Sequence, residues 1–137
     1  MDQPPLPPLP QHTQKSAWTR FIASFGYAFS GLWYVLRTQR NSRVHVGIAL
    51  LAITMGIVLH ISAVEFALIF VAITSVFIAE MFNTVMEICV DLASPEYHHL
   101  AKIAKDVAAG AVLVNAMLAV AIGLFIFGPH LWTLIIK

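Results

Sequence analysis

Apolar residues between about residue 16 and residue 38 recur with the period of a helix. The apolar positions are Trp18, Phe21, Ile22, Phe25, Phe29, Leu32, Trp33 and Leu36. At 100° per residue they cover an arc of about 120°, so they form one face of a helix. The opposite face is polar and includes Arg20 and Arg37. This pattern is typical of a helix lying in the membrane interface, with docking against another protein helix as the alternative.

Three longer apolar stretches follow, and each has enough residues to cross a bilayer. Their approximate bounds are residues 44–61, 64–91 and 95–127. No Lys, Arg, Asp or Glu occurs between Val44 and Val64, and a helix needs about 20 such residues to cross the hydrocarbon core. Ser94 and Pro95 have the pattern of an N-cap and a first helical residue, which predicts the start of the third span. The chain is therefore predicted to be an all-α integral membrane protein, with a surface helix and three transmembrane helices.

Composition supports this assignment and excludes several other classes of protein. Hydrophobic residues make up 59% of the chain, charged residues 11%, and the mean hydropathy is +0.81, beyond the range of soluble domains. Residues 1–14 are rich in proline, which predicts a disordered tail before a single domain at residues 15–137. The lone Cys89 cannot close a disulfide within the chain. Basic residues flank the apolar segments instead of forming one basic face, so no nucleic-acid partner is expected.

The placement of the basic residues also predicts the orientation of the chain. Seven of the eight Lys and Arg residues lie in residues 15–43 and 102–105, and none lies in the turn around residues 60–65. Cytoplasmic loops carry the excess of positive charge in membrane proteins. The N-terminus and the link between the second and third spans are therefore expected in the cytoplasm, and the C-terminus outside.

Acidic residues at the end of the second span need a separate explanation. In "AEMFNTVMEICVD", residues 79–91, the polar positions are Glu80, Asn83, Glu87 and Asp91. They share an arc of about 80° on a helix. If Glu65 marks the outer interface, Glu80 lies about 22 Å further along the axis, near the inner edge of the hydrocarbon core. Ionisable groups at such depth are functional candidates, since carboxylates there can bind a divalent cation or act as a general base.

Charged residues at the start of the third span extend this pattern. Lys102 and Asp106 are an i, i+4 pair, whereas Lys105 could hold a phosphate as a point charge. Acids facing a lysine at headgroup depth suit phosphoryl transfer to a lipid hydroxyl. The chain has no Walker-type loop and no protein-kinase motif. The pattern is compatible with nucleotide use without demonstrating it.

Two other functions fit parts of the pattern. In a small oligomeric transporter or channel, Glu80, Glu87 and Asn115 would line an ion path, but the carboxylates crowd one end of the spans. Asn115 also fits a role in joining helices, worth about 1 kcal/mol. A haem site using His45 and His60 is the third class, but on one helix they would lie about 22 Å apart.

The motif E-x-x-N-T-x-x-E-x-x-x-D at residues 80–91, "EYH" at residues 96–98 and "AKIAKDVAAGAVLV" closely resemble the small prokaryotic diacylglycerol kinase and undecaprenol kinase family. The resemblance is ungapped over residues 79–115. It extends weakly upstream through "RNSRVH" at residues 40–45, Gly31, "GY" at residues 26–27 and Arg20, so it covers nearly everything after the proline-rich tail. It implies a homotrimer in the bacterial inner membrane, with active sites shared between neighbouring chains. It also implies ATP-dependent phosphorylation of undecaprenol or diacylglycerol at the cytosolic face, feeding phospholipid or cell-wall lipid-carrier metabolism.

The resemblance further implies a role for each matching residue. Glu80 would be the general base, Asn83 would orient substrate or the γ-phosphate, and Glu87 would hold Mg²⁺. Lys105 with Asp106 would serve the nucleotide phosphates. The remaining implied binding residues are Asp91, Glu96 and His98 around the nucleotide, and Arg20 and Tyr27 on the surface helix.

One position departs from the family pattern. A second metal-binding glutamate usually stands just before the "RN" pair, but this chain has Gln39. An amide oxygen can still coordinate Mg²⁺, although the site then has one negative charge fewer. We therefore expect a higher Mg²⁺ requirement than in relatives that keep the glutamate. The "RNSRVH" and "LAKIAKDVAAGAVLV" segments resemble the undecaprenol kinases more, while diacylglycerol stays an alternative substrate.

Overall fold

The computed structural model describes residues 16–136, and every regular element in them is a helix. The helices are α1 (Ala17–Thr38), α2 (Arg40–Val58), α3 (Ala63–Ala93) and α4 (His99–Ile135). The prediction of an all-α fold is confirmed. The proline-rich tail predicted at residues 1–14 lies outside the described residues.

The chain divides into two compact units, with the boundary after Gly31. In the first unit, α1 carries an aromatic row. Phe21 packs edge-on against Trp18 with ring centroids 5.9 Å apart, and against Phe25 at 5.2 Å. All three rings are more than half exposed. The apolar face predicted from the periodicity is therefore present, and nothing within residues 16–31 covers these rings.

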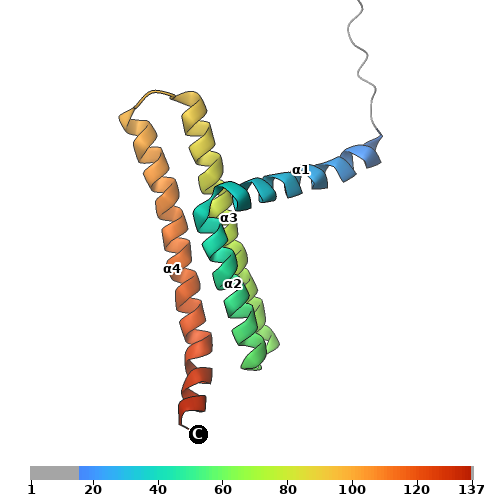
Figure 1. The fold of residues 1–137 in the computed structure, drawn as a ribbon, viewed down its shortest axis with the longest axis vertical. Coiled ribbons are helices and arrows are strands. Elements are labelled where there is room, and N and C mark those ends of the chain that lie inside the picture. The colour runs from blue at the N-terminus through green and yellow to red at the C-terminus, as the bar shows by residue number, and fades with distance from the viewer. Residues whose placement is uncertain (1–15, 137) are drawn as a thin grey trace, which may run out of the picture. The chain divides into compact units, whose positions relative to one another are not determined.

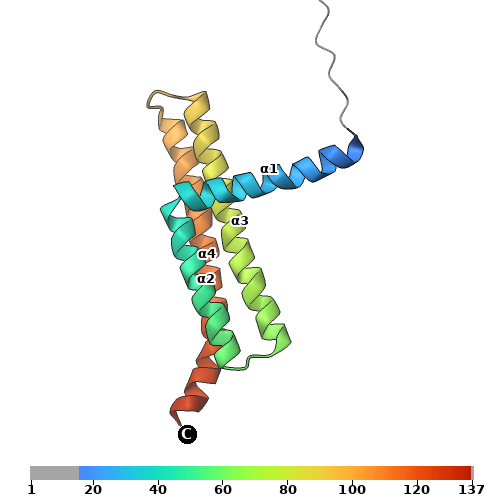
Figure 2. The same ribbon diagram turned by 45° about the vertical axis from the view of Figure 1, so that its right-hand side comes forward.

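The second unit, from Leu32 onward, contains α2, α3 and α4 as successive antiparallel helices (Figures 1 and 2). α3 packs most extensively against α4, less against α2, and α2 barely touches α4. The last turns of α3 extend past the first turn of α2, so that only α4 accompanies them there (Figure 1). α3 therefore meets α2 from Phe66 to Glu87, and its last turns meet only α4 among these helices.

A Schellman-type turn and a capping box connect α2 to α3. The Ile61 amide donates to Gly56 O at 3.1 Å and the His60 amide to Ile57 O at 3.2 Å, while His60 has a left-handed φ of 52°. These bonds satisfy carbonyls that the end of a helix leaves unpaired. Ser62 then caps α3: its Oγ accepts from the Glu65 amide, and Glu65 Oε2 accepts from the Ser62 amide at 2.7 Å. His60 thus has a backbone role, whereas His45 lies far away along α2.

The start of α4 differs from the prediction. Ser94 is the C-cap of α3, and α4 begins at His99, not at Pro95. His98 is the N-cap, with its Nδ1 accepting from the Leu100 amide at 3.2 Å. The Ser94 side chain does not cap a helix start, because its Oγ donates to the carbonyl of Glu96 at 3.1 Å within the link. α4 also continues through Pro129 to Ile135, since a proline is tolerated in an apolar helix of this kind.

The interior of the second unit is small. Its core contains Ile61, Ile69, Ile126 and Phe127. α2, α3 and α4 are each long and apolar enough to cross a membrane, and about four-fifths of each span is not buried inside the chain. Large side chains on these exposed faces, such as Phe125 at 82% exposure, need lipid or other subunits around them. The chain is a multi-pass membrane protein.

Candidate active site

Two polar rows face each other where α2 runs beside α3. On α2, Gln39 Nε2 donates to Glu87 Oε2 at 3.1 Å, and His45 Nε2 lies 3.2 Å from Glu80 Oε1. The offsets of six residues between Gln39 and His45 and of seven between Glu80 and Glu87 correspond to about 9 Å and 10 Å of helix. Both contacts therefore fit one antiparallel helix pair. Glu80 and Glu87 of the predicted polar face of α3 are therefore directed toward α2.

Glu80 is the largest side chain that is almost completely buried, with 2% of its surface exposed. His45 is its only charged or ionisable partner within ion-pair distance among the described residues. At this distance, however, Glu80 Oε1 makes no hydrogen bond among residues 16–136. The two groups are in contact without a hydrogen bond, and catalytic hydrogen bonds often align only when substrate is bound.

Glu87 accepts hydrogen bonds through both of its carboxylate oxygens. Oε2 accepts from Gln39, and Oε1 accepts from Asn83 Nδ2 at 3.0 Å. Asn83 Oδ1 is buried and has no hydrogen-bond partner in the described chain, and the same is true of Ser42 Oγ. Buried oxygen atoms without partners are costly, so they are natural ligands for a group that enters the site.

A separate ion pair lies further along α3, about 6 Å beyond Glu87 along the helix axis. Lys105 Nζ of α4 lies 2.5 Å from Asp91 Oδ1. Asp106 instead pairs with Lys102 of its own helix at 2.6 Å, with both side chains well exposed. Asp91 and Lys105 are therefore brought together, whereas Asp106 points its carboxylate at a different partner and does not join Lys105.

Among the described residues, the other predicted binding residues join neither the Glu80–Glu87 face nor the Asp91–Lys105 pair. Glu96 lies in the exposed link, where its carbonyl accepts from Ser94 Oγ at 3.1 Å. His98 uses its ring to cap α4. Arg20 and Tyr27 are exposed on α1, in the first unit.

Ser42 and His45 are site residues that the sequence prediction did not include. Gln39, Ser42 and His45 stand three residues apart, which places them on one face of α2 within about 120°. Ser42 is fully buried. The spacing was visible in the sequence, but only the packing against α3 shows that this face meets Glu80 and Glu87.

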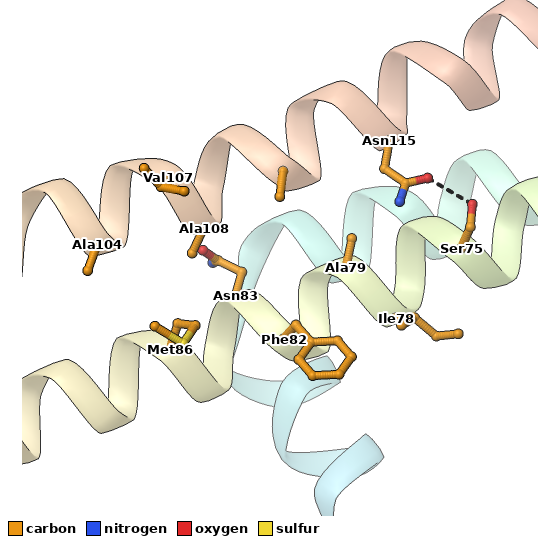
Figure 3. Close-up of a pocket in the computed structure, with 11 residues that line it drawn as sticks. Ser75, Ile78, Ala79, Phe82, Asn83, Met86, Ala104, Val107, Ala108 and Asn115 are labelled. Carbon is orange, nitrogen blue, oxygen red and sulfur yellow. Dashed lines mark hydrogen bonds between the residues drawn. The ribbon is translucent and has the colours of Figure 1, made fainter.

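Two grooves border these residues. The first lies between α3 and α4, encloses about 490 Å³, and contains Asn83 and the Ser75–Asn115 hydrogen bond (Figure 3). In that view the Asn83 amide lies beside Ala108 of α4. The second, which we call the apolar groove, encloses about 390 Å³ among α2, α3 and α4 and has His45 among its lining residues. Glu80 lines neither groove.

The donor set around Glu87 fits a magnesium ion better than a transition metal. Within residues 16–136, no three His, Cys, Asp or Glu side chains converge as a metal site. Mg²⁺ prefers oxygen ligands and is usually held by one or two carboxylates together with substrate phosphates. The Glu87 carboxylate supplies that chemistry. Gln39 and Asn83 face it through their NH2 groups, so each amide would have to turn its oxygen toward the ion to join it as a ligand.

Comparisons with known proteins show the family of the chain. Residues 26–127 match the family described as prokaryotic diacylglycerol kinase. The undecaprenol kinase of Bacillus subtilis is 43% identical over 112 residues, which cover 82% of this chain and 91% of that protein. The diacylglycerol kinase of Synechocystis sp. is 41% identical over 127 residues, covering 90% and 73%. The diacylglycerol kinase of Escherichia coli K12 is 31% identical over 105 residues, covering 77% and 86%.

Proposed function

The chain belongs to the prokaryotic diacylglycerol kinase family, and from this premise we propose that it phosphorylates undecaprenol, with diacylglycerol as the alternative acceptor. It is a membrane lipid kinase, an enzyme that transfers a phosphoryl group from ATP. Undecaprenol is preferred because the relative named for it shares 43% identity and the relative named for diacylglycerol 41%, and because of the sequence segments noted above. The comparisons give no support to a transporter or channel.

The observation that supports the mechanism is that α3 carries two carboxylates of different surroundings. Glu80 is buried, and Glu87 accepts hydrogen bonds from two carboxamides. Glu80 supplies the basic carboxylate that draws the proton from the lipid hydroxyl, because it lies at the depth where a headgroup alcohol is found. Glu87, about 10 Å further toward the end of α3, faces the phosphate donor. The low dielectric around Glu80 strengthens its electrostatic effect on a reacting hydroxyl.

Mg²⁺ is the metal that this site would hold, with Glu87 as the ligand and Gln39 as a neutral second ligand. When bound, the ion neutralises charge on the transferring phosphates. Asn83 orients the γ-phosphate through its amide, which is already fixed by Glu87. Lys105, Asp91, Asp106, Glu96 and His98 bind the nucleotide, and Arg20 and Tyr27 contact lipid or nucleotide.

The enzyme is a homotrimer of the bacterial inner membrane in this proposal. The N-terminus and the 94–105 link are cytoplasmic and the C-terminus is outside. The unburied apolar faces of α2, α3 and α4 support an assembly, since they leave much surface for neighbouring subunits. Active sites shared between chains would bring residues of the link and of α4 to the Glu80 face of a neighbour.

The test is phosphoryl transfer from labelled ATP by the purified protein in lipid, with undecaprenol and diacylglycerol offered side by side. We expect labelled undecaprenyl phosphate to form faster than labelled phosphatidic acid. Glu80→Gln should lose turnover by about 100-fold or more while ATP binding stays intact. A folded oligomer that labels neither alcohol would contradict the proposal. A faster reaction with diacylglycerol would make diacylglycerol the preferred acceptor.

A further inference from the structure

The apolar groove runs along α3 toward Glu80. Its lining residues on α3 lie between Ile69 and Phe77, with the spacing of one helix face. Glu80 follows Phe77 by three residues and Val76 by four, so it continues the same face of α3. The groove therefore ends about one helical turn from the proposed base.

The lining of the groove has the polarity of a lipid alcohol. It is aliphatic or aromatic except at His45, which is the only ionisable side chain among the lining residues. His45 marks the end next to the proposed base, because its Nε2 lies 3.2 Å from Glu80 Oε1. No hydrogen bond in the described chain holds Glu80 Oε1, so an entering hydroxyl can take a place beside the carboxylate. A molecule with one polar end and one apolar chain matches this lining.

The dimensions of the groove select a hydrocarbon chain as its occupant. On α2 the groove runs from His45 to Met55, which is about 15 Å of helix and half the thickness of the hydrocarbon core. Its volume of about 390 Å³, spread over that length, gives a cross-section of about 26 Å² and a width of about 6 Å. A helix with its side chains is about 10 Å wide, whereas carbon atoms in contact are about 4 Å apart. One hydrocarbon chain therefore fits the groove, and a whole helix of a neighbouring chain does not.

We propose that the apolar groove binds the hydrocarbon chain of the lipid acceptor and directs its hydroxyl to Glu80. This inference rests on the proposed kinase function and deepens it, because it places the acceptor while Glu80 keeps its role as the base. The groove takes a single chain. This matches undecaprenol, whereas diacylglycerol would leave its second chain in the surrounding lipid.

Gly123 of α4 lines the groove at a depth that only a long chain reaches. α4 contacts α3 through Ser75–Asn115 and Glu65–His130, and Gly123 lies about midway between the two α4 partners. It therefore stands opposite about residue 70 of α3, which is about 15 Å along the axis from the proposed base. A chain bound in the groove passes Gly123 only if it extends that far from its hydroxyl.

A larger side chain at residue 123 has room to enter the groove. Apart from the neighbouring backbone of its own helix, an added Cβ would meet only Phe127 Cδ2, at an ordinary contact distance of 4.0 Å. Gly47 of α2 offers a matched position, because a Cβ there meets nothing within 4 Å and the residue is exposed and lines neither groove. Gly123→Leu therefore shortens the groove, and Gly47→Leu leaves it unchanged.

Gly123→Leu in the full-length protein in mixed micelles tests the proposal. We expect KM for undecaprenol to rise about tenfold or more, because an apolar site tolerates extra methylene groups poorly, while KM for ATP and the oligomeric state stay unchanged. A prenol with an eight-carbon main chain spans at most about 12 Å at about 1.5 Å per bond, so it ends before residue 123. Its KM should be equal in wild type and Gly123→Leu. Gly47→Leu is the control and should keep the wild-type KM for both alcohols.

An unchanged KM for undecaprenol in Gly123→Leu would overturn the proposal. Dissociation of the oligomer in Gly123→Leu, but not in Gly47→Leu, would also overturn it, because the groove would then hold a neighbouring chain.

A second measurement decides if Gly123→Leu unfolds more easily, because it uses the wild-type protein and does not depend on turnover. An undecaprenol analogue with a photoreactive group about 15 Å from its hydroxyl should cross-link to residues that line the groove. Cross-linking only to residues outside the groove, such as Phe125 at 82% exposure, overturns the proposal. Cross-linking in the groove by a protein that phosphorylates no lipid alcohol would support the groove and show that the proposed function fails, which is a distinct result.

Discussion

At the scale of single residues, the groups that contact Glu87 determine how strongly the site binds a cation. Its two oxygens accept from the carboxamides of Gln39 and Asn83, at 3.1 Å and 3.0 Å. These neutral donors stabilise an isolated carboxylate without a metal. A second carboxylate at residue 39 would instead repel it, and only a cation could hold the two together.

Gln39→Glu tests this reading of the metal site. We expect the Mg²⁺ concentration for half-maximal activity to fall by about tenfold, equivalent to ~1.4 kcal/mol, because the site gains a charged oxygen ligand. Titration of kinase activity with Mg²⁺ measures it, and Gln39→Ala, which lacks any ligand, should shift the midpoint the other way. An unchanged midpoint in Gln39→Glu would sink the idea that residue 39 helps to hold the metal.

At the scale of elements, the α2–α3 turn holds the two helices that carry the site. Gly56 lies at its start, where a Cβ would stand 2.9 Å from both Ile61 Cδ1 and Phe66 Cζ. The close packing of Ile61 on Gly56 is the hydrophobic contact that accompanies a Schellman turn. The register between Gln39–Glu87 and His45–Glu80 depends on this end of the helix pair staying in place.

Gly56→Ala should lower the free energy of unfolding in mixed micelles by about 2 kcal/mol, because the phenyl ring of Phe66 cannot move aside as cheaply as a flexible chain end. Gly47→Ala on the same helix is the control, since a Cβ there meets nothing within 4 Å in the chain. Equal stabilities for the two variants would show that the turn is not closely packed.

The hydrogen bond between α3 and α4 gives the second prediction at this scale. Ser75 Oγ lies 2.9 Å from Asn115 Oδ1, which confirms that Asn115 joins the two helices. Asn115→Ala should cost about 1 kcal/mol of unfolding free energy and leave kcat unchanged. A large loss of turnover at unchanged stability would instead place Asn115 in the chemistry.

At the scale of the whole molecule, one chain does not complete the proposed site. Lys105 is paired with Asp91 and has no contact with the Glu80–Glu87 face among the described residues. The apolar faces of the spans are mostly unburied. Both features fit an assembly in which a neighbouring chain supplies the missing cation.

Mixing two inactive variants tests the shared site. In co-expressed Glu80→Gln and Lys105→Ala chains, about a quarter of the sites should combine an intact Glu80 with an intact Lys105 of a neighbour, so about a quarter of wild-type kinase activity should return. Co-expression of Glu80→Gln with the Glu80→Gln/Lys105→Ala double variant controls for expression. No recovery in the first mixture would mean that each chain builds its own site.

The periodicity of the sequence was sufficient to predict the helices and the part of the candidate site that lies on α3. A run without charges can only be stable as a helix in lipid, and spacings of three and four residues put Glu80, Asn83 and Glu87 on one face. Helix ends were less predictable. Ser94 and Pro95 have the pattern of a helix start, but the Ser94 hydroxyl bonds within the link and His98 caps α4 instead.

The sequence by itself determined the class of protein, the polar face of α3 and the family motif, because these depend on composition and on spacing along one helix. Only the tertiary structure decided which residues that face meets. Contacts such as Gln39 with Glu87 and His45 with Glu80 join positions 48 and 35 residues apart. Local spacing on α2 cannot reveal them, because they exist only once the α2–α3 turn folds one helix back along the other.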